Sequence, residues 1–245
     1  MYRFSLILSA AALAFSTVQL SAQPIAITNP GFEDVTGLTV YNEFNFGIPA
    51  GWLLYDLSSV STDSGTYIGT LRDPQVAFFS ESAPDGSRVL ILFNANQQGA
   101  GAYGVQQTTS EVIQANRRYE LTVQVGDIDS GTAIDTTFYN LEGFPGYRLE
   151  LLADSAPGIV GGEDVLTSDS VSLNGILAEG FFEPATVSFT VPNGHPSIGQ
   201  QLGVRLLSHN QTTGLVPEPD NEVDFDSVSL TAITVSRENE WSVLD

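Results

Sequence analysis

Oxygen-bearing side chains at opposite ends of the sequence have the types and spacing to perform chemistry together. Near the start, the stretch ITNPGFED places Gly31 and Glu33 directly after a turn, and near the end VDFDSVSL contains Asp224 and Asp226. Calcium takes about six to eight oxygen ligands, drawn from carboxylates and carbonyls. The Gly31 carbonyl, the Glu33 carboxylate and Asp226 could therefore hold this cation if the two segments meet in the fold.

Asp224 has the residue type and position of a general acid. Two-residue alternation along a strand places it on one face with Asp226, Val228 and Leu230. Burial against an apolar core disfavours the charged carboxylate, so the pKa rises and the group can stay protonated near neutral pH. The alternative is that Asp224 and Asp226 both bind calcium.

Several familiar catalytic templates are absent from the sequence. It contains no GxSxG, no HExxH and no Gly-rich phosphate loop, and it has no cysteine for disulfides, metal sites or nucleophilic catalysis. Asp127-Ile-Asp129-Ser-Gly131 resembles the start of a calcium loop, but Phe138 stands where the closing glutamate belongs. Glycoside hydrolysis by paired carboxylates stays open as an alternative, although the many acidic residues single out no pair.

The net charge of the chain limits the classes of ligand that it can bind. The sequence has 29 acidic against 8 basic residues, a formal net charge of −21. Such a surface repels nucleic acid and anionic lipid, whereas it suits neutral or cationic ligands and hard cations. Disorder is the usual expectation for a high net charge, but 42% hydrophobic and 10% aromatic residues are enough for a large core.

The first 23 residues have the layout of a secretory signal peptide. Arg3 precedes an apolar run from Phe4 to Phe15, and small residues follow at Ser21 and Ala22. A membrane anchor is the alternative, but this run is too short to span a bilayer comfortably. We therefore expect export to the periplasm or the medium, no membrane anchor in the mature form, and a single domain over residues 24–245.

Short alternating segments dominate the rest of the chain and predict an all-β fold. Gly, Pro, Asn and Asp separate them, as hairpins require. The segments are 88–93, 103–108, 119–125, 147–152, 185–191, 202–207 and 223–230. Evenly spread strands without helices predict an antiparallel jelly-roll β-sandwich, in which the first and last strands lie side by side. The gaps 126–146 and 153–183 are long enough to be functional loops or lids.

Four stretches resemble calcium-binding carbohydrate-binding modules, in order along nearly the whole mature chain. They are ITNPGFE, PAGW at 49–52, APDGSRVLIL at 83–92 and VDFDSVSL at 223–230. The resemblance implies a carbohydrate-binding-module-like jelly roll. It also implies a calcium site formed by Glu33, the Gly31 carbonyl, Asp85, the Arg88 carbonyl and Asp226.

Three further stretches resemble the Stig cyclases, which make hapalindole- and fischerindole-type alkaloids in cyanobacteria. They are YNEFNFGIPAGW, GAGAYGVQQT and TTFYNLEGFPGYRLELL. The resemblance implies an exported, calcium-dependent homodimer that converts a 3-geranyl-3-isocyanovinyl indolenine. The implied reaction is a Cope rearrangement, a cyclisation that leaves a carbocation, and then indole capture or proton loss. Because no atoms are gained, the enzyme would be an isomerase-type cyclase.

The same resemblance implies roles for individual residues. Asp224 would be the acid, Tyr103 would hydrogen-bond the acid or the indole, and the Phe138 ring would stabilise the cation. Phe144 and Trp52 would line the substrate pocket. The main rival hypothesis is a non-catalytic, secreted, calcium-stabilised carbohydrate-binding module. An enclosed apolar cavity would favour the cyclase, whereas an open aromatic platform would favour the binding module.

Overall fold

The computed structural model describes residues 22–62, 65–95, 101–212, 214–215 and 219–235. All but the last two residues of the expected signal peptide lie outside this part of the chain. Two 3-10 turns, η1 (Val60–Thr62) and η2 (Pro74–Val76), are the only helical elements among the described residues. No helix within these ranges is long and apolar enough to cross a bilayer.

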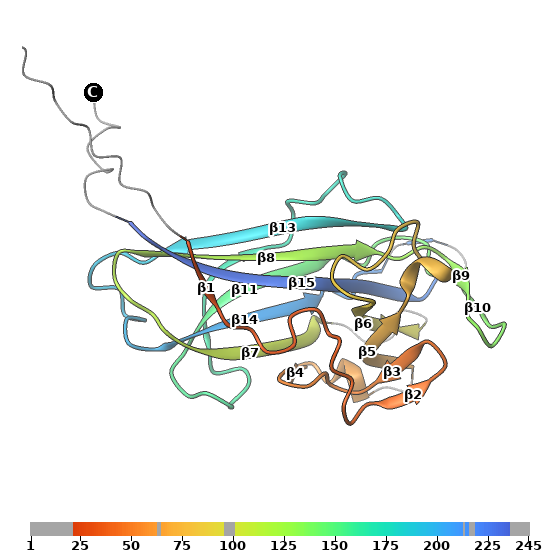
Figure 1. Cartoon of the computed structure of the whole chain (residues 1–245), viewed down its shortest axis with the longest axis horizontal. Coiled ribbons are helices and arrows are strands. Elements are labelled where there is room, and N and C mark those ends of the chain that lie inside the picture. The colour runs from red at the N-terminus through yellow and green to blue at the C-terminus, as the bar shows by residue number, and fades with distance from the viewer. Residues whose placement is uncertain (1–21, 63–64, 96–100, 213, 216–218, 236–245) are drawn as a thin grey trace, which may run out of the picture.

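Two antiparallel sheets and a short hairpin form the molecule (Figure 1). The eight-stranded sheet contains β13 (Phe181–Thr190), β8 (Arg117–Asp127), β15 (Asn221–Thr234), β6 (Arg88–Asn94), β5 (Thr66–Arg72), β3 (Phe44–Phe46) and β2 (Thr39–Tyr41) in spatial order, with β1 (Gln23–Ile25) paired to β15. The five-stranded sheet contains β12 (Asp164–Asp169), β11 (Tyr147–Asp154), β14 (Gln201–Ser208), β7 (Tyr103–Val112) and β4 (Leu53–Tyr55). The hairpin is β9 (Gly131–Thr132) with β10 (Phe138–Tyr139). The predicted antiparallel β-sandwich is confirmed.

The first described strand lies beside the last one. Gln23 of β1 pairs with Ala232 of β15, and Ile25 pairs with Leu230. Farther along the chain, the Val228 amide donates to the Pro30 carbonyl at 3.0 Å. The predicted meeting of the two ends of the chain is therefore confirmed.

Both faces of the eight-stranded sheet are covered by apolar residues. On β6, Leu90 and Leu92 point into the main core between the sheets. Val89, Ile91 and Phe93 point the other way, into a second cluster on the outer face. Strand alternation explains this division, because neighbouring side chains leave opposite faces. The outer cluster is covered by the segment around η2 and by the β9–β10 hairpin, at the end of the molecule where β2, β3, β5 and β6 gather (Figure 1).

A β-bulge in β15 changes which residues share a face. The pairing with β8 shifts register between Asp226 and Ser229, and Ser227 has a φ of 51°. The extra residue places Val228 in the main core, whereas Asp224 lies on the outer face, near the Phe182 ring. The predicted common face of Asp224 with Val228 and Leu230 is therefore wrong, although Asp224 and Asp226 do share one.

Candidate active site

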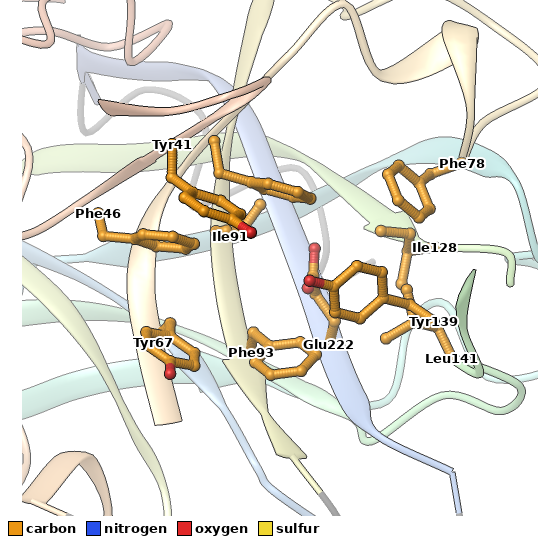
Figure 2. A pocket seen from close by; sticks show the side chains of 11 residues that line it. Tyr41, Phe46, Tyr67, Phe78, Ile91, Phe93, Ile128, Tyr139, Leu141 and Glu222 are labelled. Atoms are coloured by element: carbon orange, nitrogen blue, oxygen red, sulfur yellow. The ribbon is translucent and has the colours of Figure 1, made fainter. Parts of the chain in front are cut away.

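A cavity of about 320 Å³ lies on the outer face of the eight-stranded sheet (Figure 2). It is lined almost entirely by aromatic and aliphatic side chains, from β2, β3, β5, β6, β10, β15 and nearby loops. The lining residues are Tyr41, Phe44, Phe46, Tyr67, Phe78, Ile91, Phe93, Ile128, Tyr139, Leu141 and Glu222. This composition suits an apolar ligand.

Stacked and edge-on rings make the wall of this cavity continuous. Phe44 and Phe46 stack with centroids 5.9 Å apart, and Phe46 meets Tyr67 at 4.9 Å. On the opposite side, Phe93 and Tyr139 contact edge to face at 6.1 Å. Ring faces carry negative charge density, so a cation inside the wall gains about 0.5–2 kcal/mol from a well-placed ring.

Two hydrogen bonds hold the β9–β10 hairpin against the β2–β3 hairpin beside the cavity. The Tyr41 hydroxyl donates to Asp135 at 2.8 Å, and the Ile134 amide donates to the Glu43 carboxylate at 2.8 Å. Tyr139 of the β9–β10 hairpin depends on this attachment for its place in the wall. The half-exposed rings of Tyr41 and Tyr67 mark the open side of the cavity.

Glu222 brings the one acidic group to the lining described above. It lies on β15 opposite Phe93, and its carboxyl enters the space between the rings (Figure 2). The residue is only 3% exposed. Burial raises the pKa of Glu222 to about 8, and the charge of Asp220 contributes to this rise. Glu222 is therefore mostly protonated at neutral pH and can donate a proton.

Asp224 lies two residues farther along the same face, outside the cavity lining. It is fully buried, opposite Ile91 on β6 and Gly126 on β8. Among the described residues its carboxyl oxygens meet no amide, hydroxyl or cationic donor, and the Glu222 carboxyl is their side-chain hydrogen-bond partner. Burial raises the pKa of Asp224 well above its usual range, and the charges of Glu222 and Asp127 raise it further. Asp224 therefore has the buried environment expected of a protonated acid, but Glu222, and not Asp224, lines the cavity.

Three other predicted site residues lie in the core between the sheets. Tyr103 is fully buried there, and burial, together with the charges of Glu222 and Asp56, raises its pKa well above the usual range. Trp52 packs on Phe32 at 5.4 Å and donates to the Asn29 carbonyl, so it supports the N-terminal turn. Phe144 packs against this core too. None of the three lines the cavity, because their strands and loops belong to the other side of the sheet.

The structure also places Phe138 outside the cavity. Its side chain is 64% exposed, whereas the next residue, Tyr139, lines the wall. The reason is the alternation of the β10 strand, which sends adjacent side chains to opposite faces. Tyr139 therefore occupies the place that the sequence analysis gave to Phe138.

Sequence reasoning missed Glu222 and most of the aromatic wall. The same alternation that singled out Asp224 extends back to Glu222 in NEVDFD, and this signal could have found it. The alternating aromatics of YNEFNFG contain Tyr41, Phe44 and Phe46, but no local pattern shows that they face a cavity rather than the core.

The predicted calcium ligands do come together, at the junction of the N-terminal turn, the 85–88 turn and β15. Glu33 Oε1 accepts the amides of Ser87 at 2.6 Å and Arg88 at 2.7 Å. Asp226 Oδ2 accepts the Asp85 amide at 2.7 Å. A Cβ on Gly31 would lie 2.6 Å from Asp85 Oδ2, so glycine is needed for this close approach.

The chemistry of this donor set fits calcium. Burial raises the pKa of Asp226 to about 7, and the carboxylates of Asp85 and Glu33 raise it as well, so a cation would relieve local repulsion. Within the described ranges, no three His, Cys, Asp or Glu side chains form a metal site by themselves. The carbonyls of Gly31 and Arg88 would therefore have to supply part of the coordination, as hard cations readily accept.

The buried carboxyls predict that stability falls as pH rises. Burial raises the pKa of Asp127 to about 7, helped by Glu179 and Asp129, and that of Glu222 to about 8. An acid whose pKa is higher in the folded than in the unfolded chain contributes its full stabilisation at pH values below the unfolded-state pKa. This contribution is lost as the pH rises through the folded-state pKa. In urea unfolding at constant calcium, the free energy of unfolding should fall between pH 6 and 8. The slope near pH 8 should be smaller in Glu222→Gln, and a stability that rises over this range would contradict the assignment.

The HpiC1 cyclase family model matches residues 23–231. A cyclase from Fischerella sp., solved in its apo form, is 32% identical over 88% of this chain and 98% of its own, with a TM-score of 0.71. A Stig cyclase from Fischerella sp. TAU, in complex with (3Z)-3-(1-methyl-2-pyrrolidinylidene)-3H-indole, is 32% identical over 88% of this chain and 100% of its own, with a TM-score of 0.71. A cyclase from Fischerella sp. TAU with bound 4-(1H-indol-3-yl)butan-2-one is 33% identical over the same shares, also with a TM-score of 0.71. No curated protein sequence matches the chain.

Proposed function

The chain belongs to the HpiC1 cyclase family, and we propose that it is an exported, calcium-dependent, isomerase-type cyclase of 3-geranyl-3-isocyanovinyl indolenine. The observation that carries this proposal is the aromatic cavity with a buried carboxyl at its wall, whose pKa burial raises to about 8. Such a cavity offers an acid, rings that stabilise a cation, and shelter from water, the three things that this chemistry requires.

The residues of the cavity would act at separate points of the reaction. Protonation of the indolenine nitrogen, by the buried carboxyls of β15 among which Asp224 is the sequence-based candidate, favours the Cope rearrangement. Cyclisation then leaves a tertiary carbocation, which the rings of the wall stabilise. Attack by the indole ring followed by proton loss, or direct proton loss, completes the reaction. The proton returns to the carboxylate, so the product is an isomer of the substrate.

Calcium would be held by Glu33, Asp85 and Asp226 with the carbonyls of Gly31 and Arg88. It would supply a structural link between the N-terminal turn and β15, the strand that carries Glu222 and Asp224. We also propose that the mature protein is a homodimer. The rival function, a non-catalytic carbohydrate-binding module, calls for an open aromatic platform, and the hollow, nearly apolar cavity supports the cyclase instead.

Incubation of the mature protein with the geranylated isonitrile indolenine tests this function. We expect tricyclic or tetracyclic isomers of the substrate in the presence of calcium, resolved by chromatography and mass spectrometry, and much less with a chelator. Only the spontaneous background products under both conditions would contradict the proposal, and a glycan array would then test the binding module.

We further propose that the cavity binds (3Z)-3-(1-methyl-2-pyrrolidinylidene)-3H-indole, the compound bound by the Fischerella sp. TAU relative. This compound is itself a 3H-indole and does not carry the geranyl chain, so it can report binding without turnover.

Tyr139 and Phe138 form a matched pair of variants, because they are adjacent and only Tyr139 lines the cavity. Tyr139→Ala should lower kcat/KM about 2- to 30-fold, the loss of one ring worth about 0.5–2 kcal/mol to the cation, and it should change the product ratio. Phe138→Ala should leave both nearly unchanged in the same assay. A larger loss of kcat/KM in Phe138→Ala than in Tyr139→Ala would indicate that Phe138, and not Tyr139, lies in the active site.

A further inference from the structure

Glu222 differs from every other described residue of the cavity wall in carrying a carboxyl group. The remaining lining consists of Phe, Tyr, Ile and Leu side chains. A charged group is placed in such surroundings at a high cost unless it is paired or protonated. Its Oε1 atom is buried and meets no amide, hydroxyl or cationic donor among the described residues, and its carboxyl shares a side-chain hydrogen bond with Asp224.

Asp224 cannot make the same contact. It is fully buried, and it lies one strand step behind Glu222, opposite Ile91, which itself lines the cavity. On its other side, a Cβ on Gly126 would lie 2.5 Å from the Phe182 ring and 3.1 Å from the Asp224 Cβ, so this region is filled. A substrate in the cavity therefore meets Glu222 first, and Asp224 only if the wall moves.

We propose that Glu222, and not Asp224, is the acid that touches the substrate, an inference that rests on the proposed cyclase function. In the first step the Glu222 O–H bond breaks and an N–H bond forms at the indolenine nitrogen, which leaves the Glu222 carboxylate beside a cationic substrate. The carboxylate and the ring faces of Phe93 and Tyr139 then stabilise the cation. In the last step the carboxylate takes up the proton that the product releases, so no co-reactant is needed.

Two isosteric variants separate the two acids. Glu222→Gln keeps the shape and a donor group but has no transferable proton, so kcat should fall about 100-fold or more, the scale of general acid catalysis, with little change in KM. Asp224→Asn should lose less than about tenfold. Glu222→Asp, which retains an acid one methylene shorter, should recover part of the lost kcat. A loss in Asp224→Asn that exceeds the loss in Glu222→Gln would overturn the proposal.

A binding measurement separates this inference from the proposed function. The absorption spectrum of a conjugated 3H-indole changes when its ring nitrogen is protonated. The pyrrolidinylidene 3H-indole is a vinylogous amidine and is basic by itself, so the informative quantity is the pH at which the bound compound changes between its two spectra. This pH should be higher in the wild type and in Asp224→Asn than in Glu222→Gln, because the Glu222 carboxylate stabilises the protonated ring. A raised value without turnover by the wild type would refute the cyclisation and keep Glu222 as the acid. An identical value in Glu222→Gln would refute the role of Glu222, and absence of both binding and turnover would refute both.

Discussion

Removal of calcium should lower the Tm of the mature protein by roughly 5 to 15 °C. A ligand present at 100 to 1,000 times its Kd stabilises a fold by about 2.7 to 4.1 kcal/mol. For a domain of this size, each kcal/mol corresponds to about 2 to 4 °C. The effect is large because the proposed calcium would join the N-terminal turn, the 85–88 turn and β15. Thermal unfolding with calcium and with a chelator measures it directly.

Glu33→Ala should abolish this response to calcium. It removes a carboxylate that accepts the Ser87 and Arg88 amides, so its Tm should match that of the chelated wild type or lie below it. Asp34→Ala is the matched control, since Asp34 is the next residue and lies outside the proposed site. Its Oδ1 atom accepts a hydrogen bond from the Thr36 amide at 3.0 Å. The control should keep the full calcium shift. An equal calcium-dependent change in Tm in the wild type and in Glu33→Ala would contradict a calcium site at Glu33.

The second large effect should come from Arg205→Ala, which we expect to lower the free energy of unfolding by about 3 to 5 kcal/mol. Arg205 donates to Glu150 at 2.7 Å and to Glu163 at 2.6 Å, and its guanidinium lies 3.9 Å from the centre of the Tyr55 ring. The side chains of Arg205, Glu150 and Glu163 are at most 4% exposed. Loss of the arginine leaves the buried Glu163 carboxylate without a cation and Glu150 with Arg148 alone, 2.9 Å away, and this undercompensated charge dominates the cost.

An exposed ion pair provides the control for Arg205. Arg72 and Asp73 lie 3.4 Å apart with side chains 47% and 48% exposed, so Arg72→Ala should cost less than about 1 kcal/mol. Urea unfolding of both variants gives the comparison. Glu163→Gln should recover part of the loss in the Arg205→Ala background, because it removes the buried carboxylate that has lost its cation. A similar small cost for Arg72→Ala and Arg205→Ala would show that burial of the cluster does not matter.

The sequence predicted the long strands well because their alternation is strong. The short strands β2, β3 and β4 and the edge strand β12 were missed, since each depends on a neighbouring strand more than on its own pattern. The central strand β5 was missed too. Its Gly69 weakens the strand signal, yet β3 approaches so closely that a Cβ there would lie 2.1 Å from the Asn45 carbonyl oxygen. Only the folded neighbour shows why glycine is required.

The two predicted sites differ in how far the sequence could define them. The meeting of Glu33 and Asp226 could be predicted because the pairing of the first and last strands is a topological signal, whereas Asp85 came only from the resemblance to calcium-binding modules. The cavity could not be defined in the same way, because its wall combines short strands, a loop and a hairpin on the outer face of a sheet. The bulge at Ser227 also reverses the alternation of β15, so pattern alone could not assign the faces of Asp224 and Val228 together.

A crystal structure of the protein with the pyrrolidinylidene 3H-indole is the most direct test of where the substrate reacts. We expect the compound in the cavity, against the rings of Phe93 and Tyr139, with its ring nitrogen within hydrogen-bonding distance of Glu222. Binding beside Tyr103 in the core between the sheets, or on the outer face of the five-stranded sheet, with nothing bound against Phe93 and Tyr139, would contradict the assignment of this cavity as the active site.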